Sequence, residues 1–229
     1  MARGIWFLVP VLTGLALPAL AQTELTLSAN GAAQAEPDEA VANFNVQAVK
    51  PNASNAQGAV NQAVAKAMVA AHAVPGVVVT TGSYDSYSST PDGQTKPQFT
   101  ARQSLTLVQP AKDGVPDKAF TDLLAKLQAD GLLLNGLSGE LSEAGQDMLQ
   151  QAAIRDALVQ LRSQAKAIAV TLHKKVGALK TLNVNSGGGL LPPAPRVMAL
   201  AAAPAPQSAP DKVRMTAHVT AKIELDPAS

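Results

Sequence analysis

Apolar residues recur every three or four positions along residues 149–172 and predict the longest helix of the chain. This spacing places one apolar stripe on a helix, with polar residues on the opposite side. The stripe consists of Ile154, Leu158, Leu161, Ala165, Ile168 and Leu172, widened by the small side chains of Ala153, Ala157 and Ala169. Such a helix is not stable alone. We therefore expect it to pack on a sheet, which is the usual role of an apolar stripe.

Alternating apolar and polar residues predict strands elsewhere in the chain. The alternation runs without a break along residues 213–225, so this segment is expected to cross the whole sheet. Residues 24–31 and 42–48 also alternate, and they are expected to pair antiparallel on either side of a break at residues 36–38. Further strands are predicted at residues 77–81, 99–107, 132–141 and 178–184, and the segment 132–141 is expected to be buried.

Two shorter helices are predicted between these strands, at residues 53–71 and 115–127. Pro116 suits a first helical turn, and Gly131 is expected to stop the second of these helices. The hydroxyl of Ser142 can serve as the N-cap of the long helix. This order of elements predicts an α+β fold, in which a mainly antiparallel sheet is covered by helices on one face, as one unit or as two coupled halves.

A polar segment between two predicted strands, residues 82–97, carries both tyrosines of the chain. We expect this segment to be a hairpin excursion. Tyr84 and Tyr87 either form a recognition tip on the hairpin or pack its base. Packing is the usual role of aromatic residues beside strands. Both tyrosines are candidate interaction residues.

Residues 186–211 are rich in Gly, Ala and Pro and cannot be helix or central strand throughout. A segment of this length without secondary structure is uncommon in a compact domain and is usually functional or disordered. Its apolar side chains are candidates for burial against a second subunit or another partner, and the alternative is a plain linker. The candidate residues are Leu190, Leu191, Val197 and Met198.

The first 21 residues have the pattern of a secretory signal peptide. Arg3 precedes an apolar run at residues 5–17, and residues 19–21 provide an Ala-x-Ala cleavage pattern. The run is too short for a membrane span, so we expect no transmembrane anchor after cleavage. The sequence therefore predicts a periplasmic protein with one domain at residues 22–229.

Charge and cysteine content narrow the range of partners. The chain has 18 Lys and Arg against 17 Asp and Glu, and removal of Arg3 with the leader makes it formally neutral. Nucleic acid is therefore not an expected partner. The chain contains no cysteine, so neither a disulfide framework nor a thiol nucleophile is available to it.

No catalytic, cofactor-binding or metal-binding residue is predicted from the sequence. The histidines are His72, His173 and His218, and no pair of them has the spacing of metal ligands. Glu140 and Glu143 flank a strand-to-helix junction, where carboxylates usually stabilise the helix N-terminus instead of performing acid–base chemistry.

Short motifs along the chain form a recognisable series: Leu27-Ser28-Ala29-Asn30-Gly31, Pro37-Asp38, Thr80-Thr81-Gly82-Ser83-Tyr84, Phe99-Thr100-Ala101-Arg102-Gln103, Leu134-Asn135-Gly136-Leu137 and Ala153-Ile154-Arg155-Asp156-Ala157. In order and spacing they resemble the SIMPL-domain family, which includes bacterial periplasmic immunogenic proteins and oxidative-stress-defence proteins. The resemblance covers nearly the whole chain after residue 21. One departure is His173, which lies where the family often has a helix-ending Gly. A left-handed conformation is less comfortable for His.

The resemblance implies an exported α+β protein linked to envelope or oxidative-stress functions, and it supplies no catalytic residue. Long alternating strands offer edges for pairing. We therefore expect a non-enzymatic interaction or assembly protein whose partner is a second copy or another envelope protein. The alternative is a small-ligand-binding protein, or a hydrolase-like enzyme whose site forms only in the folded chain.

Overall fold

The computed structural model describes residues 23–90, 95–185 and 210–228. These residues form two antiparallel sheets and three α-helices, which confirms the predicted α+β class. In chain order the elements are β1 (Thr23–Ala35), β2 (Glu39–Lys50), α1 (Ala53–His72), β3 (Val78–Ser89), β4 (Gln98–Pro110), the 3-10 turn η1 (Lys112–Gly114), α2 (Lys118–Ala129), β5 (Leu133–Glu140), α3 (Glu143–Thr171), β6 (Lys174–Asn185) and β7 (Val213–Pro227).

One half of the molecule, here called the four-stranded half, contains a sheet in the order β3-β4-β2-β5. Strands β3 and β4 pair antiparallel, as expected for a hairpin, but residues 82–89 of the polar segment belong to β3 itself and not to an excursion from it. Helices α1 and α2 cover one face of this sheet and enclose a core of large side chains. The largest side chains fully buried in this core are Phe44, Phe120, Leu105, Leu107, Leu124 and Leu127.

The other half, here called the three-stranded half, contains a sheet in the order β1-β7-β6, covered on one face by α3. The segment with unbroken alternation forms β7, the central strand of this sheet. Its apolar side chains face α3 and are buried, while its polar side chains lie on the open face. The buried side chains of β7 are Val213, Met215, Ala217, Val219, Ala221, Ile223 and Leu225.

Helix α3 lies very close to β1, and this close approach changes the predicted stripe. A Cβ atom placed on Gly31 of β1 would lie 2.2 Å from the carbonyl oxygen of Ala153 and 2.2 Å from the backbone nitrogen of Ala157. Small residues therefore form the centre of the contact, and the larger apolar residues flank it. Leu172 is 50% exposed, so the expectation that it belongs to the core is wrong. The buried residues are Leu149, Ala153, Ala157, Leu161, Ala165 and Ala169.

Two predictions about strands are wrong. The first strand does not pair with the second, because β1 pairs with β7 while β2 pairs with β4 and β5. The break at residues 36–38 is a crossing between the two halves, not a turn. The segment predicted as a buried strand is β5, which lies at an edge of its sheet with Leu133 exposed.

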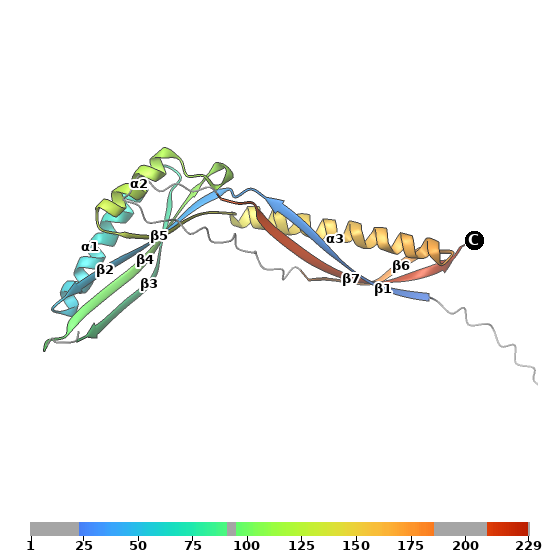
Figure 1. Cartoon of the computed structure of the whole chain (residues 1–229), viewed down its shortest axis with the longest axis horizontal. Coiled ribbons are helices and arrows are strands. Elements are labelled where there is room, and N and C mark those ends of the chain that lie inside the picture. The colour runs from blue at the N-terminus through green and yellow to red at the C-terminus, as the bar shows by residue number, and fades with distance from the viewer. Residues whose placement is uncertain (1–22, 91–94, 186–209, 229) are drawn as a thin grey trace, which may run out of the picture.

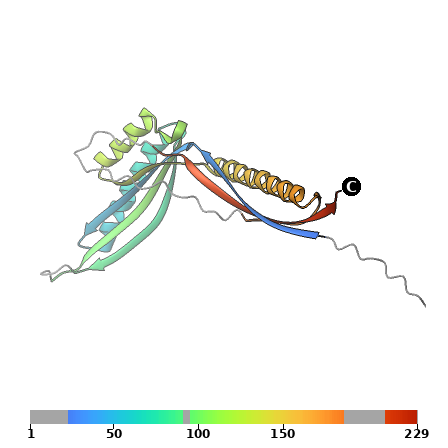
Figure 2. The same cartoon turned by 45° about the vertical axis from the view of Figure 1, so that its right-hand side comes forward.

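The junction between the halves is built around Asp38. Its carboxylate accepts hydrogen bonds from the backbone N–H of Ser142 and from the Ser142 hydroxyl, the latter at 2.7 Å. Ser142 is also the N-cap of α3, as predicted, and accepts a hydrogen bond from the N–H of Gly145. In Figures 1 and 2 the halves meet at an angle, with the helices on the convex side and the uncovered sheet faces on the concave side.

The helix ends follow local capping rules. Asn52 and Asp117 cap the N-termini of α1 and α2 with their side chains, so Pro116 lies just outside α2 and not in its first turn. Gly131 follows α2 at a φ of 91°. His173 follows α3 at a φ of 52°, which confirms that a non-glycine residue takes the left-handed position there.

Candidate functional site

One edge of the three-stranded sheet is partly covered by the chain itself. At the β1 edge, the backbone N–H of Ala32 donates a hydrogen bond to the Asp156 carboxylate of α3 at 3.0 Å. Helix α3 lies mainly over β1 and β7. Covering an edge with a helix is one way in which proteins prevent unwanted strand pairing. Near Ala32 the β1 edge is therefore protected against pairing with another strand.

The opposite edge, β6, is open and apolar. Within residues 23–90, 95–185 and 210–228, β6 pairs with β7 only. Val176, Leu179, Leu182 and Val184 pair with the buried residues of β7 and so share the face on which α3 lies. They are nevertheless 41%, 54%, 41% and 44% exposed, because α3 lies mainly over the other two strands. An apolar edge strand is a template for pairing with another chain.

The two parts of β6 differ in how well they can accept another strand. The first part, residues 174–180, contains register shifts at Val176/Leu179 and Leu179/Thr181. It also carries Lys174, Lys175 and Lys180. Both bulges and lysines hinder edge pairing. The second part, residues 181–185, keeps a regular register with β7 and carries no charge. We call residues 181–185 the β6 edge segment.

Lys180 is held in place by the central strand. Its amine contacts the carboxylate of Glu224 at 2.6 Å, and this hydrogen bond raises the pKa of Lys180. The side chain of Glu224 belongs to β7, so the ion pair ties the irregular part of β6 to its neighbour. The charge of Lys180 is therefore compensated within one chain.

The tyrosines lie on opposite faces of β3. Tyr84 is paired with Gln103 and Tyr87 with Thr100, in a register that places them on different sides of the sheet. Tyr87 lies on the open face, where the guanidinium of Arg102 stands 5.9 Å from its ring centre and also contacts Asp85 at 3.2 Å. The two tyrosines therefore do not form one recognition tip.

The histidines do not come together. His72 lies at the end of α1, His173 follows α3, and His218 lies on β7. His218 contacts Asn30 Oδ1 through Nδ1 at 2.7 Å and Thr220 Oγ1 through Nε2 at 3.3 Å. Within the described part of the chain, no group of three or more His, Cys, Asp or Glu residues is arranged to hold a metal ion.

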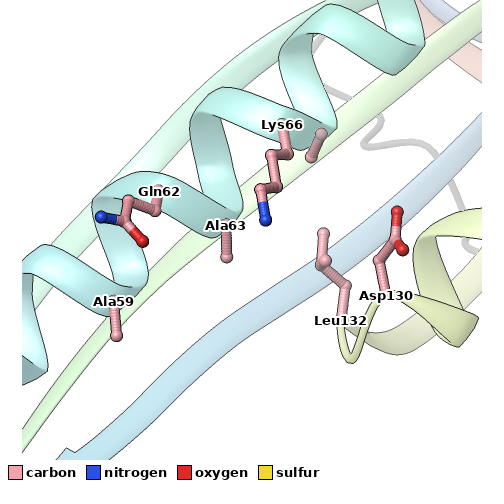
Figure 3. Close-up of a pocket in the computed structure, with 7 residues that line it drawn as sticks. Ala59, Gln62, Ala63, Lys66, Asp130 and Leu132 are labelled. Atoms are coloured by element: carbon pink, nitrogen blue, oxygen red, sulfur yellow. The ribbon is translucent and has the colours of Figure 1, made fainter.

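A small cavity lies between α1 and the segment that follows α2 (Figure 3). Its volume is about 190 Å³, and Lys66 and Asp130 bring an amine and a carboxylate to its walls. A cavity of this kind can hold a small polar molecule, so it is one candidate site for the alternative of a small-ligand-binding protein. The remaining lining residues are Ala59, Gln62, Ala63, Ala67 and Leu132.

Comparison with known protein families decides the relationship of the chain. Residues 25–223 match the family model SIMPL, described as a protein of unknown function (DUF541). The chain belongs to the SIMPL family. No curated protein matches it. The match includes every described helix and both sheets except the outer ends of β1 and β7, so the resemblance recognised in the short motifs is confirmed.

In this SIMPL chain, one of those motifs lies at the junction of the two halves. Asp38 binds Ser142, and Pro37 packs against Gly114, where an added Cβ would lie 2.7 Å from the proline Cβ. Asp156, from the motif on α3, accepts a hydrogen bond from the backbone N–H of Ala32 at the β1 edge. These SIMPL motif residues therefore fix how the halves and α3 are placed.

Sequence reasoning missed the β6 edge segment as a candidate site of the SIMPL domain. The signal was present, since polar and apolar residues alternate through Thr181, Leu182, Asn183, Val184 and Asn185. The position of α3 decides which side chains of β6 stay exposed, and the sequence pattern of a strand does not show where α3 lies. The candidate residues Leu190, Leu191, Val197 and Met198 lie outside the described residues. Among the described helices, none is long and apolar enough to cross a membrane.

Proposed function

We propose that this SIMPL protein is an exported periplasmic protein that binds other polypeptide chains at the β6 edge and performs no catalysis. The observation that supports this function is the contrast between the two edges of the three-stranded sheet. At the β1 edge, Asp156 of α3 accepts a hydrogen bond from the backbone N–H of Ala32, whereas β6 presents half-exposed apolar side chains beside an open edge. In strand addition, main-chain hydrogen bonds supply affinity and side-chain pockets supply specificity.

The energetics favour a partner at this edge. Full burial of a Val or Leu side chain stabilises by about 1.5–3 kcal/mol, and Leu182 and Val184 have roughly half of that still to gain. An added strand also pairs backbone N–H and C=O groups, each bond contributing about 1 kcal/mol. These gains offset the ordering of the incoming strand only if its own side chains fit against α3.

Export is part of the same proposal. The charged start, apolar run and Ala-x-Ala pattern of residues 1–21 support cleavage before Gln22. A chain without cysteine needs no disulfide formation after export. Envelope or oxidative-stress conditions would then be the setting in which the bound partner acts, as the resemblance to SIMPL proteins of that group suggests.

Site-specific photocrosslinking in intact cells tests the proposed function. A photoreactive residue at Leu182 should capture protein in the periplasmic fraction, and the captured chain should begin at Gln22. The control position is Val159, which is also apolar and exposed but lies on the outer side of α3. Equal capture at both positions, or none at Leu182, would contradict binding at β6, and a chain that retains Met1 would contradict export.

A further inference from the structure

The β6 edge segment has a pattern that is symmetrical about its central residue. Asn183 is flanked by the apolar residues Leu182 and Val184, and these are flanked by the polar residues Thr181 and Asn185. Leu182 and Val184 share the α3 side of the sheet because they pair with Ala221 and Val219 of β7. A strand with this pattern is complementary to its own antiparallel copy.

We infer that the chain bound at the β6 edge is a second copy of this protein, with the two β6 strands paired antiparallel about Asn183. This inference rests on the proposed function and names its partner. In that register Leu182 lies opposite the partner's Val184, and Val184 lies opposite the partner's Leu182. Directly opposed residues share one face of an antiparallel pair, so the apolar side chains of both copies meet on the α3 side.

The lysines at the start of β6 favour antiparallel over parallel pairing of the two copies. A parallel arrangement would place Lys174 and Lys175 beside the same lysines of the second copy, and like charges directly opposite destabilise a strand pair. The antiparallel register about Asn183 separates the two Lys174 side chains by more than about 50 Å, at about 3.3 Å per residue. Lys180 is already compensated by Glu224. The antiparallel pair therefore keeps the lysines of the two β6 strands apart.

The pairing would join the two three-stranded sheets into one continuous sheet. The two-fold axis runs perpendicular to that sheet, so both copies of α3 lie on the same face. The half-exposed residues Leu182 and Val184 would then form a shared apolar strip between the two helices. A two-fold interface of this kind closes on itself and does not propagate into a filament.

Charge exchange at Asn183 tests the inference. Asn183 is exposed and lies on the axis, so Asn183→Lys places two like charges directly opposite each other, and so does Asn183→Asp. Each variant alone should dimerise at least tenfold more weakly than the original protein in sedimentation equilibrium and native mass measurement. An equimolar mixture of the two variants should restore dimers that contain one copy of each. The matched controls are Gln34→Lys and Gln34→Asp, which change an exposed amide side chain on the other edge strand, β1.

The outcomes separate the inference from the proposed function. Loss of dimers in both single variants, with recovery in the mixture, supports pairing about Asn183. A monomeric original protein overturns the inference, and so does an oligomer that the Asn183 variants leave unchanged. If Leu182 then captures a different protein in cells, the proposed function stands with another partner. If Leu182 captures only residues 186–209 of its own chain, the edge is occupied internally and both proposals fail.

Discussion

The two halves of the molecule bury their apolar surfaces in different ways. The four-stranded half uses two helices and large side chains such as Phe44 and Phe120, which are fully buried between helices and sheet. The three-stranded half uses one helix, whose alanines lie against Ala29 and Gly31. One helix does not cover three strands, so β6 keeps its apolar side chains half exposed. The difference indicates that the three-stranded half has apolar surface left for a partner on the face where α3 lies.

The comparison also shows which kind of substitution destabilises each half. A core of large side chains loses stability when a side chain is shortened, because a cavity remains. A contact between backbone and small residues loses stability when a side chain is enlarged, because the backbones must move apart. The three-stranded half therefore depends on the absence of side chains at a few positions.

The largest expected effect is that of Gly31→Ala. The new Cβ would lie 2.2 Å from backbone atoms of Ala153 and Ala157, and no rotamer can relieve a clash of a Cβ atom. We expect a loss of about 3 kcal/mol in the free energy of unfolding, at the upper end for overpacking, measured by urea unfolding. The control is Gly136→Ala, where a Cβ would meet nothing within 4 Å, and a change within about 0.5 kcal/mol is expected. Equal effects at both positions would show that α3 does not lie tightly on β1.

A smaller effect is expected at the junction of the halves. Asp38→Ala removes the acceptor of both hydrogen bonds from Ser142. Because the site is open to solvent, the loss should be about 1 kcal/mol, within the usual range for hydrogen bonds at helix caps. Asp147→Ala, at an exposed position of α3, serves as the control in the same urea series. A loss no greater than that of the control would mean that other contacts hold the junction.

Much of this fold could be predicted from local patterns. The alternation of β7, the helix of α3 and the Ser142 cap each depend on residues close in sequence, and each is confirmed. The pairing of β1 with β7 could not be predicted, because the pattern of a strand shows which face is buried but not which strand lies beside it. The candidate site depends on that pairing and on the position of α3, so the sequence indicated apolar residues at 178–184 without showing that they stay half exposed.

The smallest expected effect concerns the charge of Glu39, at the start of β2 beside the junction. Burial, with the nearby carboxylates of Asp38 and Glu140, raises the pKa of Glu39 above its ordinary value. The native state therefore binds more protons than the unfolded state in the pH range between the ordinary and the raised pKa. Stability falls as pH rises through that range, and the ionised group carries a small cost at neutral pH.

Replacing Glu39 by Gln should remove that cost. We expect a gain of a few tenths of a kcal/mol at pH 7, roughly the size of other surface-charge effects, and no gain once the pH lies below the ordinary pKa of about 4.3. Urea unfolding at pH 7 and at pH 4 measures both. Glu143→Gln provides a control of opposite sign at pH 7, because Glu143 lies in the first turn of α3, where a negative charge stabilises the helix. A loss of stability on Glu39→Gln at pH 7 would mean that the ionised carboxylate has a favourable partner at the junction.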